Sequence, residues 1–249
     1  MEPVPEIHAV SLHLKRLEFT GFTLVPQALA PSHLARVRKR LDGLFHDHAN
    51  VPTAVEDYRR TSLPGSGSID INRLFELNPV FEDLMDLPTV LPIVQAALGH
   101  DATLCCDATG NHRAPRSRAA TLWHRDGGPY LRLTYFLDDI TEHNGATAFL
   151  PGSHLSSEPP PPWANHDGQP RLLPGMVHAT GPAGACLLNN TNLWHTNTPN
   201  ESDRPRRVIW LLFKPSQVEF ASHDEMKSTD AYIASQADPR RRALMGLTD

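Results

Sequence analysis

The chain has 249 residues, of which 40% are hydrophobic, and carries a formal net charge of −5 at pH 7. This length and composition suffice for one sizeable core, so we expect a single domain over residues 1–249. The negative charge gives no attraction for phosphate groups, which excludes nucleic acid and anionic membrane surfaces as expected partners.

Cysteine usage and the N-terminal residues indicate the compartment. Cys105 and Cys106 are adjacent and Cys186 stands alone, so no disulfide framework is indicated. Residues 1–6 are acidic and contain prolines, unlike a secretory signal, and no apolar run approaches the length of a membrane span. We therefore expect a cytoplasmic protein, either a monomer or a homodimer.

The N-terminal part of the chain is predicted to contain two helices with a strand between them. Leu12, Leu17 and neighbouring apolar positions indicate a helix that ends near Gly21, and residues 22–25 are typical of a short strand. In residues 31–46 apolar side chains recur at helical spacing, with basic residues outside the stripe. This second helix is expected to pack against a sheet.

Two further segments complete the N-terminal region. Residues 60–71 contain a run of turn-forming residues and no periodicity, so we expect a surface loop. Residues 81–98 are predicted to be helical, with a break or kink at Pro88 and Pro92, because proline lacks the backbone donor and clashes with the preceding turn.

Beyond these helices the pattern changes to short runs of β-forming residues. Such an order favours a mainly β fold with α-helices, a double-stranded β-helix (jelly roll, cupin-like) in which the N-terminal helices cover one sheet. We expect the helical cover over about residues 1–100, the jelly-roll core over about 101–215 and a C-terminal helical segment over about 220–247. A proline-rich insertion, residues 156–174, should be extended and non-helical. The expected strands are residues 102–108, 119–124, 130–137, 146–150, 176–179, 185–188 and 207–214.

Three residues with metal-binding side chains occur in a spaced pattern. His124 and Asp126 are two apart, and on a strand such residues project to the same side while Arg125 points away. His195, preceded by Trp194, can supply a second imidazole from far downstream. Two imidazoles and one carboxylate can occupy one face of an octahedral Fe(II), which leaves three positions for a chelating oxo acid and O2. Because a His-x-Asp tripeptide is expected about once by chance in a chain this rich in histidine, its context has to support the assignment.

That context is a series of further motifs in a fixed order. Arg206 follows His195 by eleven residues. In this order the segments resemble the phytanoyl-CoA dioxygenase family of Fe(II)- and 2-oxoglutarate-dependent oxygenases, from about residue 123 to residue 213. The motifs that carry the resemblance are Trp123-His124-Arg125-Asp126, Asn144-Gly145, Pro151-Gly152-Ser153-His154, Trp194-His195 and Arg206.

The resemblance implies roles for four residues. His124, Asp126 and His195 are implied as the Fe(II) ligands and catalytic centre. Arg206 is implied to bind the distal carboxylate of 2-oxoglutarate through its planar guanidinium. Its neighbour Arg207 faces the opposite side of a strand, so we expect it to be solvated or ion-paired.

Four other polar residues are implied, by position, as contacts of 2-oxoglutarate. Thr134 stands where the family often has Trp, and Asn197 stands where several members have Ser; both depart from the family pattern but can form hydrogen bonds. Asn111 matches an Asn that touches the oxo acid in some relatives, and Arg113 lies near the family's usual Lys.

The implied activity is the oxidation of an unactivated C–H bond of a small organic molecule, with Fe(II), 2-oxoglutarate and O2. Hydroxylation is the expected outcome, with succinate and CO2 as coproducts. Bacterial members of this kind often tailor natural products, so secondary metabolism is the expected setting. No substrate-binding residue is identified singly; residues 60–72 and 156–174 are the segments expected to contact substrate.

Two kinds of alternative stay open. The same chemistry can give epimerisation, cyclisation or desaturation instead of hydroxylation, depending on the position of the substrate. A different class would be a non-redox metal-binding jelly-roll protein or a zinc-dependent cupin-like enzyme. Arg206 argues against that class, because such a site has no need for a group that binds an oxo acid.

Overall fold

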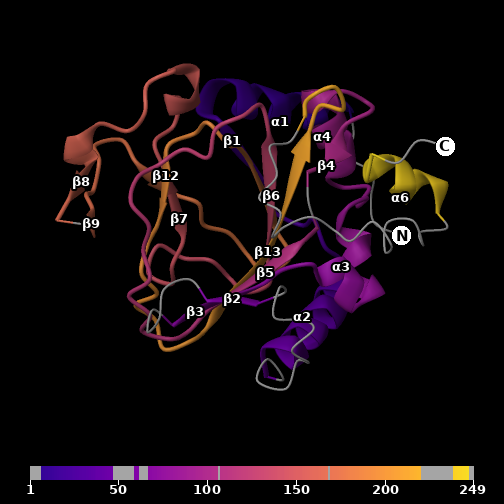
Figure 1. The fold of residues 1–249 in the computed structure, drawn as a ribbon, viewed down its shortest axis with the longest axis horizontal. Helices are drawn as coiled ribbons and strands as arrows, with labels where there is room; N and C mark the ends of the chain where they lie inside the picture. The colour runs from indigo at the N-terminus through magenta and orange to yellow at the C-terminus, as the bar shows by residue number, and fades with distance from the viewer. Residues whose placement is uncertain are drawn as a thin grey trace.

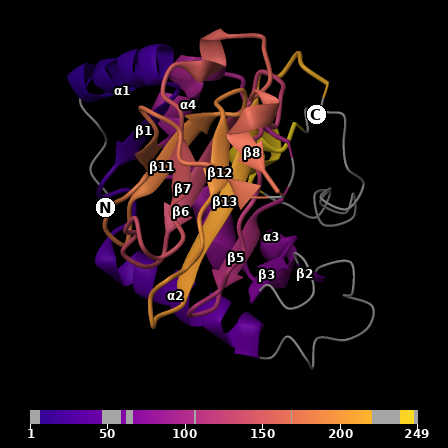
Figure 2. The ribbon, with the colours of Figure 1, turned by 90° about the vertical axis from the view of Figure 1, so that its left-hand side faces the viewer.

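Two antiparallel sheets face each other across the centre of the protein (Figure 1). The computed structural model describes residues 7–46, 59–61, 67–105, 107–167, 169–219 and 238–246. The larger sheet has the order β1-β11-β6-β13-β5-β3-β2, with β4 beside β13, and the smaller one has the order β10-β7-β12. Figure 2 shows β7 and β12 of the smaller sheet in front of β6 and β13 of the larger one.

The strand bounds are as follows. The larger sheet contains β1 (Phe22–Val25), β2 (Arg59–Thr61), β3 (Ser68–Ile71), β4 (Thr103–Leu104), β5 (Thr109–Arg113), β6 (Leu131–Phe136), β11 (Cys186–Asn190) and β13 (Arg206–Lys214). The smaller sheet contains β7 (Thr147–Phe149), β10 (Val177–His178) and β12 (His195–Asn197). A separate two-stranded arm consists of β8 (Asn165–His166) and β9 (Gln169–Pro170).

Helices cover the outer face of the larger sheet, the face turned away from the smaller sheet (Figure 1). They are α1 (Ile7–Thr20), α2 (Pro31–His46), α3 (Leu74–Leu77), η3 (Pro79–Leu84) and α4 (Leu91–Leu98). Two short 3₁₀ helices, η4 (Ser153–Leu155) and η5 (Pro162–Ala164), lie after β7, and α6 (Pro239–Leu244) contacts β4. No helix in the described ranges has the length and apolar character needed to cross a bilayer.

The central strand β6 separates an apolar layer from a polar one. Leu131, Leu133 and Tyr135 belong to the core between the sheet and the helices. Arg132 and Thr134 alternate with them and line a cavity between the two sheets. This alternation follows from the period of two along a strand. The Tyr135 hydroxyl donates to the Leu84 carbonyl oxygen at 2.8 Å, so the sheet is also joined to the helix layer by a hydrogen bond.

Most predicted elements are confirmed. The strand at residues 22–25 and the helix at residues 31–46 have the predicted bounds, and the mainly β jelly-roll fold with covering helices is observed. The predicted helical region at residues 81–98 is divided: η3 ends at Leu84 and α4 begins at Leu91, with Pro92 in its first turn. Of the C-terminal segment only residues 238–246 are described, and they include α6.

Two predictions need correction, and one strand was not predicted. Residues 60–71 are not simply a surface loop, because β2 and β3 pair there and β3 joins β5 at the edge of the larger sheet; residues 62–66 lie outside the described residues. In residues 119–124 only His124 pairs, through a single bridge. The sequence analysis also missed β5, in which Asn111 and Arg113 face the cavity and no run of apolar residues marks a strand.

Candidate metal centre and the adjoining cavity

Backbone pairing brings the two histidines of the predicted triad together. The His124 amide donates to the His195 carbonyl at 3.0 Å, and the His195 amide donates to the His124 carbonyl at 2.9 Å. His195 is the first residue of β12, and His124 is its antiparallel partner in an isolated bridge. The Asp126 amide donates to the Thr191 carbonyl at 2.9 Å, which fixes the third member beside them.

The side chains of His124, Asp126 and His195 converge. Their potential ligand atoms all lie within 4.8 Å of one another, and among the described residues they form the one such group of His, Cys, Asp or Glu. Asp126 Oδ1 lies 3.6 Å from His124 Nε2, and Asp126 Oδ2 lies 3.6 Å from His195 Nε2. Adjacent ligands on an octahedral ion with bonds of about 2.1 Å are about 3 Å apart, so a slight contraction would accommodate a cation.

Both histidines have the tautomer that a metal ligand needs. His124 Nδ1 lies 2.7 Å from the Leu122 carbonyl, and His195 Nδ1 lies 2.9 Å from the Leu193 carbonyl. Because a carbonyl only accepts, each Nδ1 carries a proton, which leaves Nε2 as the ring nitrogen that can bind a metal. Burial lowers the pKa of His195 to about 4, so its ring is neutral at pH 7.

Asp126 has a basic neighbour that the sequence analysis missed. Arg132 Nη2 lies 3.0 Å from Asp126 Oδ2. Burial alone would raise the pKa of Asp126, but Arg132 and the two histidines outweigh it and keep the pKa below its usual value. Arg132 occurs in the run Leu-Arg-Leu-Thr-Tyr-Phe. A charged residue that alternates with apolar ones in a predicted strand could have indicated this role.

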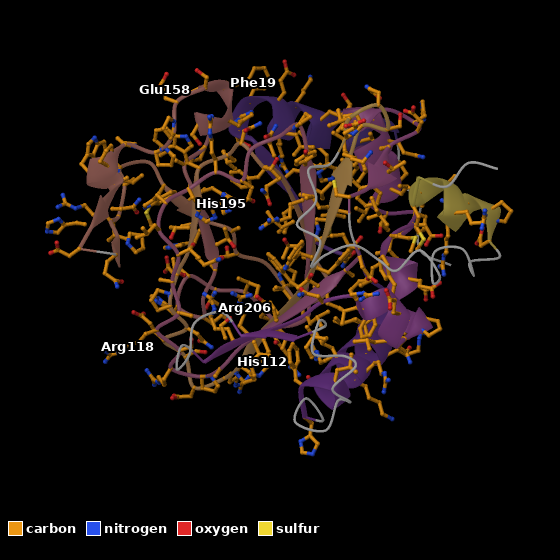
Figure 3. The ribbon with its side chains drawn as sticks, viewed as in Figure 1. Phe19, His112, Arg118, Glu158, His195 and Arg206 are labelled. Carbon is orange, nitrogen blue, oxygen red and sulfur yellow. The ribbon has the colours of Figure 1, made fainter. Side chains whose placement is uncertain are left out.

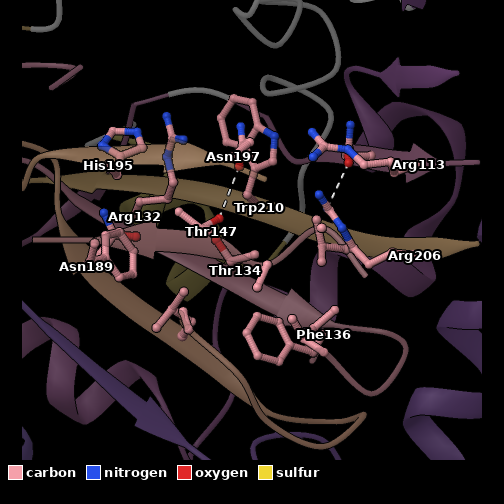
Figure 4. A pocket seen from close by; sticks show the side chains of 18 of the residues that line it. Arg113, Arg132, Thr134, Phe136, Thr147, Asn189, His195, Asn197, Arg206 and Trp210 are labelled. Atoms are coloured by element: carbon pink, nitrogen blue, oxygen red, sulfur yellow. Dashed lines mark hydrogen bonds between the residues drawn. The ribbon is translucent and has the colours of Figure 1, made fainter. Parts of the chain in front are cut away.

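A cavity of about 240 Å³ extends from His195 to Arg206 between the sheets (Figure 4). Figure 3 shows both residues in the interior of the protein. We call the group His124, Asp126, His195 and Arg132 the metal end, and the group Arg113, Arg206 and Asn111 the arginine end. The predicted contacts Thr134, Asn197, Asn111 and Arg113 all line this cavity. His124 and Asp126 lie beside His195 at its end.

The arginine end is buried and hydrogen-bonded. Arg206 Nη1 donates to Asn111 Oδ1 at 2.9 Å, while its buried Nε has no hydrogen-bond partner in the described part of the chain. The Asn111 amide donates to Ser68 Oγ at 3.1 Å and to Asp70 Oδ1 at 2.5 Å. Both acceptors belong to β3, so the segment predicted as a loop supports the guanidinium of Arg206.

Arg113 places a second cation beside Arg206. Its Nη1 donates to the Thr198 carbonyl at 2.6 Å, and its side chain is buried like that of Arg206. Burial, together with the charge of Arg113, lowers the pKa of Arg206 to about 9, which still leaves it protonated at pH 7. Two buried cations this close favour an anion in the adjoining space, because an anion would compensate their desolvation.

Arg207 lies on the other side of β13, as predicted. It forms a salt bridge with Asp138 at 2.6 Å and a second one with Asp42. Its hydrogen bonds to Asp138 hold its pKa above the usual value for arginine. Of the two neighbouring arginines, therefore, Arg206 alone lines the cavity.

Thr134 and Asn197 occupy the middle of the cavity. Thr147 donates to Asn197 Oδ1 at 3.2 Å, as the dashed line in Figure 4 marks. Thr134 is the register partner of Trp210 on β13, and both line the cavity. Trp210 was not predicted as a site residue. It lies in an apolar run of β13, where a tryptophan cannot be told from a core residue by sequence.

The tryptophan before each histidine attaches the proline-rich insertion to the metal end. Trp123 Nε1 donates to the Arg171 carbonyl at 2.7 Å, and Trp194 Nε1 donates to the Glu158 carbonyl at 3.1 Å. Asn165 accepts from the Trp123 amide at 2.8 Å and donates to the Trp123 carbonyl at 3.2 Å. The insertion is thus fixed directly next to the two imidazoles.

Comparisons with known proteins agree with this architecture. L-proline trans-4-hydroxylase of Streptomyces griseoviridis is 22% identical over 228 residues, which cover 78% of this chain and 82% of that protein. Dioxygenase af480 of Aspergillus fumigatus is 26% identical over 161 residues, and the match covers 60% of this chain but only 49% of that relative, about half its length. The solved structure of the epimerase SnoN in complex with Fe3+, alpha ketoglutarate and nogalamycin RO has the same fold, with a TM-score of 0.70, 16% identity and 94% of each chain covered.

The sequence profile described as phytanoyl-CoA dioxygenase (PhyH) matches residues 17–208, most of the chain. Enzymes of this family use Fe(II), 2-oxoglutarate and O2, so the binding-protein alternative is set aside. The chain therefore belongs to the phytanoyl-CoA dioxygenase family of Fe(II)- and 2-oxoglutarate-dependent oxygenases.

Proposed function

We propose that His124 Nε2, His195 Nε2 and one oxygen of Asp126 bind Fe(II), and that the enzyme hydroxylates a C–H bond of a small organic molecule. The observation that carries this proposal is the convergence of the three ligand atoms within 4.8 Å, at one end of a cavity whose other end holds Arg206. Two imidazoles and a carboxylate suit Fe(II) and leave further positions for 2-oxoglutarate and O2.

The arginine end is proposed to bind the distal carboxylate of 2-oxoglutarate. Arg206 offers a planar fork of donors, and its Nε has no partner among the described residues. Arg113 adds positive charge, and Thr134 and Asn197 line the space toward His195. Asn111 already accepts from Arg206, so its main contribution is to orient that guanidinium.

Fe(II), 2-oxoglutarate and O2 together supply the oxidising power for C–H cleavage, with succinate and CO2 as coproducts. The protein contributes position and exclusion of water. Arg206 fixes the far end of the oxo acid, which aligns its near end with the metal end. Phe136, Ile140 and Val208 line the cavity with apolar surface, which limits the water that it holds.

The substrate is proposed to approach from the side of His124. The cavity, at about 240 Å³, is smaller than the usual range for drug-sized ligands, about 300–1,000 Å³, and suits the cosubstrate. The His124 side chain is 39% exposed whereas that of His195 is 5% exposed, so the metal end opens toward His124. The insertion held by Trp123 and Trp194 lies at this opening and is proposed to contact substrate.

Anaerobic titration with Fe(II) and 2-oxoglutarate tests the assignment. We expect a weak visible charge-transfer band for the wild-type protein and none for His124→Ala or Asp126→Ala. Arg116→Gln is the matched control, because Arg116 forms an Arg–Asp pair with Asp203 on the exposed surface. The absence of a band in the wild type, or its presence in Asp126→Ala, would contradict the proposed ligand set.

Product analysis decides between hydroxylation and the alternative outcomes. Hydroxylation adds one oxygen atom to the substrate, desaturation and oxidative cyclisation remove two hydrogen atoms, and epimerisation leaves the mass unchanged. Incubation of candidate natural-product substrates under isotopically labelled O2, followed by mass spectrometry, distinguishes them. Labelled oxygen in the product is the expected result.

A further inference from the structure

Arg132 occupies a particular place at the metal end. It lies two residues before Thr134 on β6, so both side chains face the cavity. Its Nη2 lies 3.0 Å from Asp126 Oδ2. The other carboxylate oxygen, Oδ1, lies 3.6 Å from His124 Nε2. Oδ2 itself lies 3.6 Å from His195 Nε2, so the arginine contacts a carboxylate whose two oxygens each face one of the imidazoles.

The guanidinium of Arg132 is held from a second direction. Its central carbon lies 4.9 Å from the centroid of the Trp210 ring, a cation–π arrangement. Figure 4 shows Arg132 at the same end of the cavity as His195, with Trp210 nearby. Contact with an aromatic face and with a carboxylate restricts a side chain that otherwise has many rotamers. Arg132 is thus a fixed support for Asp126.

We propose that Arg132 is a positioning residue of the metal centre: through its contact with Oδ2 it fixes the orientation of the Asp126 carboxylate between the two imidazoles. This inference rests on the proposed assignment of His124, Asp126 and His195 as ligands. Groups that orient a metal ligand are commonly worth about 10- to 100-fold in metal affinity. Among the described residues, Arg132 is the one arginine or lysine paired with Asp126, so its role has no substitute there.

Calorimetric titration with Co(II), in the absence of 2-oxoglutarate, measures this role without turnover. We expect Arg132→Gln to bind Co(II) about 10- to 100-fold more weakly than the wild type. The visible Co(II) spectrum should also change, because the carboxylate would no longer be fixed in one orientation. Arg132→Lys should recover part of the affinity, since an ammonium can reach Oδ2 but lacks the planar contact with Trp210.

Arg116→Gln is the matched control, because it removes an Arg–Asp pair of 2.8 Å on the surface and should leave Co(II) affinity and spectrum unchanged. Thermal unfolding of each metal-free variant shows whether it is folded, and Arg132→Lys provides the test if Arg132→Gln is not. Unchanged Co(II) affinity in a folded Arg132 variant would overturn the inference. Tighter binding would also overturn it, since Arg132 would then compete with the cation for Asp126.

Co(II) binding by two variants separates the role of Arg132 from the ligand assignment on which the proposed function depends. If Asp126→Ala binds Co(II) as well as the wild type does, the ligand assignment is wrong, and with it the proposed function. If Asp126→Ala loses binding while Arg132→Gln retains it fully, the ligand assignment stands and only the positioning role of Arg132 is wrong.

Discussion

The two ends of the cavity are built in different ways. The arginine end lies on the central strands β5 and β13, and the side chains of Arg113 and Arg206 are almost completely buried. At the metal end, His195 and Arg132 belong to strands β12 and β6, but His124 is held by one isolated bridge, Asp126 lies in the loop that follows, and His124 is partly exposed. Paired strands therefore fix the arginine end, whereas the positions of His124 and Asp126 depend more on side-chain contacts. Under the proposed function, this difference suits an enzyme that binds the same cosubstrate in every turnover and admits its substrate beside the metal.

Removal of a ligand at the metal end should have the largest effect. His195→Ala leaves two of the three ligand atoms, and we expect 2-oxoglutarate-dependent succinate formation to fall to background. The cavity and the arginine end should persist, because β12 is held by backbone pairing with β7. Succinate release, measured with Arg116→Gln as control, checks this. Turnover at the wild-type rate would show that His195 is not a ligand of the catalytic metal.

The next largest effect is expected at the arginine end. Arg206→Gln removes a buried charge that would pair with the cosubstrate, a change that costs about 2–5 kcal/mol in comparable pairs. This corresponds to a loss of about 30-fold or more in 2-oxoglutarate affinity. Anaerobic titration of the charge-transfer band measures it.

Arg207→Gln is the control for that experiment. It removes the neighbouring arginine, whose partners Asp138 and Asp42 lie outside the cavity, so it should lower stability and leave 2-oxoglutarate affinity unchanged. Equal losses of 2-oxoglutarate affinity in the two variants would contradict the different roles assigned to the two faces of β13.

In the metal-free protein, the free energy of unfolding should depend on pH through the protonation of His195. The pKa of His195 is lowered from 6.5 to about 4 in the folded protein, so the unfolded chain binds the proton more readily between these values. Stability is therefore lost as the pH falls below about 6.5, by at most about 1.4 kcal/mol per pH unit from this group. Thermal unfolding of wild type and His195→Gln from pH 7 to pH 4 tests this. A slope as steep in the variant as in the wild type would contradict the assignment to His195.

The smallest effect is expected from a substitution that weakens the attachment of the proline-rich insertion. Asn165→Ala removes two hydrogen bonds to the Trp123 backbone, each worth about 0.5–1.5 kcal/mol. Hydrogen exchange of residues 156–174 should become faster, while 2-oxoglutarate affinity stays unchanged, because the arginine end is not touched. Gln95→Ala, which loses a hydrogen bond to the His100 carbonyl far from the site, is the control. Weaker 2-oxoglutarate binding in Asn165→Ala would show that the two ends are coupled.

The sequence was informative where a local rule fixes the direction of a side chain. The period of two along β13 assigned Arg206 and Arg207 to opposite faces, and the structure has them so. Helical spacing predicted α2 with its bounds. The family motifs indicated three residues that the fold brings within 4.8 Å. Each of these three predictions depends on residues close together in the sequence or on a fixed spacing between motifs.

Other features depended on which strands become neighbours. Gly110 makes β5 look unlike a strand, yet a side chain there would meet Leu41 of α2 at 2.6 Å, so close packing against the helix explains the glycine. Asp70 supports Asn111 only because β3 pairs with β5. Thr134, which stands where the family often has Trp, has Trp210 as its partner across the strands.

The sequence by itself determined the fold class, the candidate ligands and most of the elements, though not β2, β3 and β5, because backbone periodicity and motif spacing are local properties. Only the tertiary structure decided that Arg132 contacts Asp126, that Trp123 and Trp194 hold the insertion, and that β3 supports the arginine end. The physical reason is that these contacts join residues far apart in the chain, and their geometry follows from sheet register and packing, which no local pattern specifies.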